Sequence, residues 1–69
     1  MTNVSILRGK IVECNTTQEA LADAIGVNRS TFYRKMKDNG KNFTVGEVEK
    51  IANILSLNSE DVMKIFFAP

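Results

Sequence analysis

The chain has 69 residues and a net charge of +1. Of its residues, 43% are hydrophobic and 25% are charged, which is the composition of an ordinary soluble globular domain. A single cysteine excludes an internal disulfide, and the lack of histidine leaves too few ligands for structural zinc. No apolar run is long enough for a membrane span or a signal peptide, so we expect one cytoplasmic domain over residues 1–69, without a cofactor. We expect Cys14 to be buried or half-buried at the end of a helix.

The basic residues are unevenly distributed along the chain. Five of the nine fall within residues 29–41, a segment with one acid, Asp38, whereas the other four share the rest of the chain with seven acids. Such an asymmetry is expected of a protein that binds phosphates with one face. A solvated helix face with chance clustering explains the charge pattern equally well.

Apolar spacing predicts five helices and no strand, an all-α fold. Residues 3–14 have helical spacing, with Asn3 or Thr2 as the N-cap. The next helix is predicted to begin at Thr16, because Thr16 and Glu19 have the spacing of a capping box.

Gly26 is predicted to end the second helix, because glycine accepts the positive φ of a helix C-terminus. Asn28 is a suitable N-cap for a third helix over residues 29–38. Its apolar side holds only Phe32 and Met36. A separate outward arc collects polar residues, namely Arg29, Ser30, Tyr33, Arg34 and Lys37.

A second capping box, Thr44 with Glu47, is predicted to start an amphipathic helix over residues 45–55. Asn58 or Ser59 caps the last helix, which has more apolar surface than one face of a short helix can easily bury. We therefore expect one of its two phenylalanines in the core and the other in a homodimer seam; a clamp over the first and fourth helices is the alternative. The candidate dimer residues are Met63, Phe66 and Phe67.

Two helices joined by a short glycine-containing turn, the second with polar residues outward, are typical of a DNA-binding helix-turn-helix. Ala22 is small enough to let the two helices cross closely. Residues 18–37 resemble the helix-turn-helix of the phage repressor and Cro family, also called the Xre family. The matching residues are Gln18, Ala22, Gly26, Val27 and Phe32. The chain departs from the family at Lys35, where an apolar residue is usual; we expect Lys35 to be solvated.

The resemblance implies a five-helix, lambda-repressor-like domain of the bacterial cytoplasm or nucleoid. Such a domain binds double-stranded operator DNA in the major groove as a homodimer and regulates transcription, with residues 29–38 as the recognition helix. Because no linker follows Phe67, we expect a complete Cro-like regulator rather than the first domain of a longer repressor.

Carried over residue by residue, the resemblance implies base reading by Arg29, Ser30 and Arg34. Arginine suits this role because its guanidinium can bond both O6 and N7 of guanine. Tyr33 is expected to contact a phosphate or a thymine methyl, or alternatively to cover Met36. Contacts with the DNA backbone are expected from Thr17, Gln18, Asn28, Lys37, Lys41 and Asn42.

The sequence offers no histidine and no reactive constellation, so we expect neither an enzyme nor a small-molecule substrate. The alternative to a DNA-binding regulator is a protein-interaction module of the same fold, acting as an anti-repressor or as a modulator of a repressor. Steep salt dependence would distinguish DNA binding from this alternative.

Overall fold

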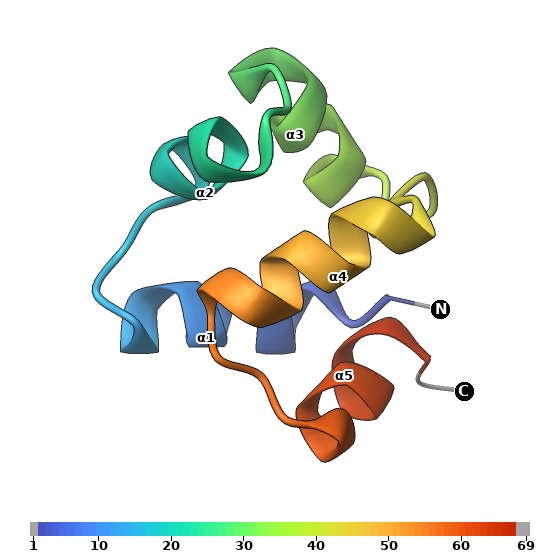
Figure 1. The fold of residues 1–69 in the computed structure, drawn as a ribbon. Helices are drawn as coiled ribbons and strands as arrows, with labels where there is room; N and C mark the ends of the chain where they lie inside the picture. Colours follow the sequence, from blue (N-terminus) through green and yellow to red (C-terminus); the bar gives the residue numbers. More distant parts are fainter. Residues whose placement is uncertain (1, 68–69) are drawn as a thin grey trace.

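Five helices follow one another along residues 2–67, the part of the chain that the computed structural model describes (Figure 1). They are α1 (Val4–Glu13), α2 (Gln18–Ile25), α3 (Arg29–Lys37), α4 (Val45–Ile54) and α5 (Ser59–Phe66). Residues 2–67 contain no strand, which confirms the predicted all-α class. None of these helices is long and apolar enough to cross a membrane.

Each helix begins at a side chain that accepts a hydrogen bond from the backbone of the first turn, and this explains where the helices start. The five N-caps are Asn3, Thr17, Asn28, Thr44 and Asn58. The Thr44 cap forms the predicted capping box with Glu47, and Asn58 forms a second one with Asp61. The structure thus selects Asn3 over Thr2 and Asn58 over Ser59.

The predicted start of the second helix at Thr16 is wrong by one residue. The Thr17 hydroxyl oxygen, rather than that of Thr16, accepts the hydrogen bond from the Ala20 amide, at 3.1 Å. The Thr16 amide instead donates to the carbonyl of Ile11, at 3.2 Å. Thr16 therefore completes the end of α1, and its amide is not free to bond the carboxylate of Glu19.

The apolar sides of all five helices meet in one core. α2 packs against α1, α3 and α4, and Ala22 is fully buried there, as its small size predicts. Phe43 connects α3 to α5, because its ring packs edge-to-face on Phe32 at 5.6 Å and on Phe66 at 6.3 Å. The buried residues are Val4, Leu7, Ile11, Leu21, Ala22, Ile25, Phe32, Met36, Ile51, Leu55, Ile65 and Phe66.

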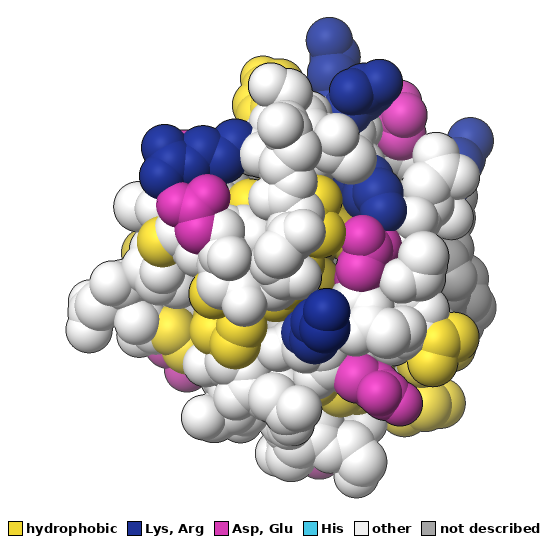
Figure 2. All heavy atoms as spheres, turned by 45° about the horizontal axis from the view of Figure 1, so that its top comes forward, with side chains coloured by type: hydrophobic (Ala, Val, Ile, Leu, Met, Phe, Trp, Pro, Cys, Tyr) yellow, Lys and Arg dark blue, Asp and Glu magenta, His cyan; other side chains and the backbone are white. Residues whose placement is uncertain are grey.

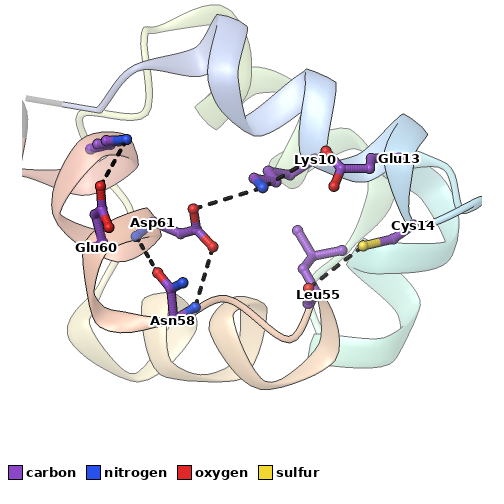
Figure 3. A network of polar contacts seen from close by, with 8 residues as sticks. Lys10, Glu13, Cys14, Leu55, Asn58, Glu60 and Asp61 are labelled. Carbon is purple, nitrogen blue, oxygen red and sulfur yellow. Dashed lines mark hydrogen bonds and ion pairs between the residues drawn. The ribbon is translucent and has the colours of Figure 1, made fainter.

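Polar contacts join α1 to α5 and to the end of α4 (Figure 3). Lys10 of α1 pairs with Asp61, the residue that completes the Asn58 capping box, at 3.7 Å. At the start of the chain, the Asn3 amide donates to the carbonyl of Ile65. The two helices at opposite ends of the sequence are therefore held side by side.

The expectation that Cys14 is buried or half-buried is wrong, because the residue is exposed. Cys14 is the C-cap of α1, where the chain leaves the core, and Asn15 next to it has a φ of 56°. The burial at this end of the core is supplied by Ile11 and Leu55 instead. The Cys14 thiol donates a hydrogen bond of 3.5 Å to the Leu55 carbonyl (Figure 3).

Two glycines with similar positive φ angles permit a prediction about stability. Gly26 has a φ of 75° and Gly40 a φ of 68°, so alanine at either position is strained by about 1–2 kcal/mol. A Cβ at Gly26 meets nothing within 4 Å, whereas one at Gly40 would lie 2.5 Å from the Thr2 Cβ. We expect Gly40→Ala to lower the free energy of unfolding about twice as much as Gly26→Ala, measured by urea denaturation. The excess should shrink in a Thr2→Gly background; equal losses would contradict the close approach of Thr2.

Candidate nucleic-acid interface

The orientation of α3 is fixed by its two ends and its buried side. Gly26 adopts the left-handed conformation that ends α2, and Asn28 caps α3 three residues before Thr31. Phe32 and Met36 are buried, with exposed fractions of 1% and 2%. The opposite side of α3 therefore faces outward over its whole length.

This outward side holds the four predicted base-reading residues. All four are exposed, and Tyr33 has an exposed fraction of 66% although Met36 next to it is buried. On this side, α3 exposes to solvent the ring of Tyr33, the Ser30 hydroxyl and the guanidinium groups of two arginines. The residues are Arg29, Ser30, Tyr33 and Arg34.

Two hollows in the surface show which predicted residues the fold brings together. The first gathers residues of α2 and α3: Gln18, Glu19, Arg29, Ser30, Phe32 and Tyr33. The second joins α3 to the loop that follows it: Thr31, Arg34, Lys35, Asp38 and Asn42. Gln18 thus lies beside Arg29, Ser30 and Tyr33, while Arg34 lies beside Asn42.

The side chains that cap α2 and α3 keep donors free for a ligand. The Thr17 oxygen accepts from Ala20, and the Asn28 Oδ1 accepts from Ser30 at 2.9 Å and from Thr31 at 3.4 Å. These bonds use acceptor atoms only. The Thr17 hydroxyl hydrogen and the Asn28 amide group remain available as donors, which is the kind of group that binds a phosphate oxygen.

The predicted backbone-binding lysines lie farther along the chain. Lys37 is exposed in the last turn of α3, and Lys41 is exposed in the loop after it. Lys41 lines a third hollow, an apolar groove, rather than the hollow around Arg34. The apolar side chains of this groove are those of Phe43, Val45, Val48, Val62, Phe66 and Phe67.

Cations are concentrated around α3, but some are neutralised. Figure 2 shows Lys and Arg side chains over the upper part of the molecule, which α3 occupies in Figure 1, with acidic side chains among them. Arg29 pairs with Asp23 and Lys35 pairs with Glu47. The other three cations of residues 29–41 form no ion pair with any described residue: Arg34, Lys37 and Lys41.

The expectation that Lys35 is only solvated is wrong. Its Nζ lies 2.7 and 2.9 Å from the two carboxylate oxygens of Glu47, and each side chain of the pair is 16% exposed. The ammonium also lies 5.8 Å from the centre of the Phe43 ring. Lys35 thus fills the position where an apolar residue was expected, and it does so with its charge compensated by α4.

The Lys35–Glu47 pair predicts how stability depends on pH. Burial would raise the pKa of the Glu47 carboxyl, but hydrogen bonds from Lys35 and from the Thr44 amide hold this pKa below its ordinary value of 4.5. Because the folded pKa is lowered, the stabilisation is complete above pH 4.5 and is lost as the pH falls through the folded pKa. We expect the free energy of unfolding of wild type to exceed that of Glu47→Gln by about 1 kcal/mol at pH 7, and this difference to shrink steadily as the pH falls below 4.5.

Urea denaturation at pH 7 and at a series of lower pH values measures this difference. Glu49→Gln is the matched control, because Glu49 is exposed on the same helix and forms no ion pair with a described residue. This control should stay within about 0.5 kcal/mol of wild type. A difference between wild type and Glu47→Gln that does not shrink as the pH falls would mean that the ion pair is not its cause.

Residues 2–69 match the family described as protein of unknown function (DUF739). The chain belongs to the DUF739 family. No curated protein and no solved structure matches it. The resemblance of residues 18–37 to phage repressors therefore rests on the sequence motif.

Two residues outside the set of predicted site residues adjoin the candidate interface of this DUF739 chain. Asp23 bonds the guanidinium of Arg29, and opposite charges on both sides of the turn were the signal that pointed to it. Arg8 of α1 is exposed and lines a hollow together with Thr17, Gln18 and Tyr33. From the sequence, Arg8 was expected by default to be solvated, with a phosphate contact as the minority alternative; the packing of α1 against α2 brings it to this hollow.

Of the three candidate dimer residues of the DUF739 chain, one lies in the core and two lie on the surface. Phe66 is buried, with an exposed fraction of 6%, whereas Met63 and Phe67 are 58% and 60% exposed. Phe67 borders the apolar groove, which also includes the exposed Val45 and the half-buried Val48. One phenylalanine is thus in the core and the other is available to a partner.

Within residues 2–67, no group of three or more His, Cys, Asp and Glu side chains is arranged to hold a metal ion. The hollows beside α3 are open at the surface, and polar and charged side chains line them together with the rings of Phe32 and Tyr33. What this side of the molecule offers a ligand is an exposed helix with hydrogen-bond donors and positive charge.

Proposed function

We propose that this protein is a sequence-specific DNA-binding regulator of transcription, related in its mode of action to phage repressors and Cro. In this proposal α2 and α3 form a helix-turn-helix, and α3 enters the major groove of operator DNA. Arg29, Ser30 and Arg34 read base edges, and Tyr33 contacts a phosphate or a thymine methyl. The alternative, a protein-interaction module of the same fold, is an outcome of the test below.

The observation that carries the proposal is the outward side of α3. A helix that buries only Phe32 and Met36 exposes a tyrosine and cations to the surroundings. Three of the nearby cations, Arg34, Lys37 and Lys41, have no acidic partner among the described residues. Unpaired cations on an exposed helix that fits a groove are the features by which helix-turn-helix proteins bind phosphates and bases.

The surroundings of α3 support the same role. Thr17, Gln18 and Asn28 place free donors at the N-termini of α2 and α3, where the helix dipole favours a phosphate. These groups fix the register of a protein on DNA without reading sequence. Arg8, beside Tyr33 in a hollow shared with α2, extends the basic border toward α1.

The test is the salt dependence of binding. Duplexes selected by the purified protein from a random DNA pool serve as probes, and fluorescence anisotropy gives Kd between 50 and 200 mM salt. If Lys37 and Lys41 each neutralise one phosphate, affinity should fall about 12-fold per subunit over this range, from a slope near −0.9 per contact. Recovery of no DNA, or binding that ignores salt, would favour the protein-interaction module.

We further propose that the protein binds DNA as a homodimer through the surface around Met63 and Phe67. Exposed apolar side chains beside an apolar groove support this choice. Sedimentation should detect a dimer for wild type on DNA, and Phe67→Ala should weaken it without unfolding the protein, because Phe67 is exposed. A wild type that binds DNA only as a monomer would rule out the dimer.

A further inference from the structure

An ion pair spans the turn between α2 and α3. Arg29, the first residue of α3, donates from Nε to the Asp23 Oδ1 at 3.0 Å and from Nη2 to Oδ2 at 2.5 Å. The hydrogen bond from Arg29 holds the pKa of the Asp23 carboxyl below its ordinary value, so Asp23 is ionised at neutral pH. Both side chains remain more than half exposed, with fractions of 62% for Arg29 and 54% for Asp23.

The contact uses only one edge of the guanidinium. Arginine has five N–H donors in a rigid planar fork, and Asp23 accepts one from Nε and one from Nη2. Three donors remain, two on Nη1 and one on Nη2, and one from each nitrogen points outward along the end of the group. That spacing matches the O6 and N7 acceptors of guanine in the major groove.

We propose that Asp23 is a positioning residue for base recognition, which holds Arg29 side-on so that the free end of its guanidinium reads a guanine. This inference rests on the proposed DNA-binding function. A long side chain that is already ordered loses less conformational entropy on binding than a mobile one. The carboxylate also opposes a contact between Arg29 and the DNA backbone, because an acid beside a phosphate is repelled. Asp23 therefore directs Arg29 to bases and raises specificity more than affinity.

The experiment compares four variants on the duplex selected by wild type. They are Asp23→Ala, Arg29→Ala, the double variant and Glu19→Ala. Kd is measured for that duplex and for duplexes in which each guanine pair is replaced in turn. Glu19 is the matched control, because it is an exposed acid of α2 beside Arg29 in the same hollow but makes no hydrogen bond with it.

Arg29→Ala should abolish the preference at one guanine, on the order of 5- to 150-fold. Asp23→Ala should lower the preference at that same pair about fivefold, the size expected when one side chain must be immobilised on binding, and should have no effect on it in the Arg29→Ala background. Glu19→Ala should change Kd for all duplexes by one common factor. Circular dichroism of each variant checks that the helices are intact.

Two results would overturn the positioning role. A preference that is unchanged or sharper in Asp23→Ala would mean that the carboxylate masks Arg29 instead of orienting it. An Arg29→Ala protein with every preference intact would mean that Arg29 reads no base. Both differ from failure of the proposed function itself, in which wild type shows no salt-dependent binding to DNA and Asp23 consequently has no base reader to position.

Discussion

Replacing Phe32 by alanine is expected to lower the free energy of unfolding by about 3–5 kcal/mol. Phe32 is 1% exposed and packs edge-to-face on Phe43, so its removal leaves a cavity between α3 and the loop that precedes α4. Small domains have a total stability of about 5–15 kcal/mol, and a chain of this size has little reserve. Thermal unfolding followed by circular dichroism should show Tm lowered by roughly 20 °C.

The control for Phe32→Ala is the neighbouring aromatic residue. Tyr33 is 66% exposed, and alanine is a better helix former than tyrosine, so Tyr33→Ala should change the free energy of unfolding by less than about 0.5 kcal/mol. The two variants thus remove aromatic rings from adjacent positions of α3, one buried and one exposed. A Phe32→Ala protein that melts within a few degrees of wild type would contradict the packing of α3 described above.

For the proposed function, Arg34→Ala is expected to reduce the preference at one base pair of the operator by about 5- to 150-fold. Arg34 is exposed on the outward side of α3 and has no acidic partner among residues 2–67, so its whole donor fork is available to a base. The measurement is Kd for the selected duplex and for each of its single-base-pair variants, at one salt concentration.

Lys37→Ala is the matched control for Arg34→Ala, because Lys37 is an exposed and unpaired cation three residues farther along the same helix. A phosphate contact carries no sequence information, so this variant should weaken all duplexes alike and reduce the salt slope by about one. Equal losses on selected and random DNA for both variants would falsify the assignment of Arg34 to a base.

Local features of the fold were predictable from the sequence. Asn28, Thr44 and Gly26 act on backbone groups within three or four residues of themselves, so residue type and spacing determine their roles. The burial of Phe32 and Met36 followed from helical periodicity for the same reason. Errors of one residue arose where two threonines competed, because the choice between Thr16 and Thr17 depends on how α1 ends.

Features that depend on a distant partner were not predictable. Lys35 is partly buried because Glu47 of α4 meets it, twelve residues away in the sequence, and no helical wheel of α3 contains that information. Cys14 is exposed because the bend after α1 turns it out of the core. At the candidate site, the sequence indicated the outward arc and placed opposite charges on the two sides of the turn, but whether Arg29 meets Asp23 depends on the angle between two helices.

The hydrogen bond from Asn3 to Ile65 bears on how the molecule opens. It joins the start of α1 to the last turn of α5, so fraying of either helix removes support from the other. This hydrogen bond joins residues at the two ends of the chain, whereas α2 and α3, which also pack together, follow each other in the sequence. The backbone amide hydrogens of α1 and α5 are therefore expected to exchange with solvent in one shared opening event. The amides of α3 around the buried Phe32 and Met36 are expected to stay protected during that event.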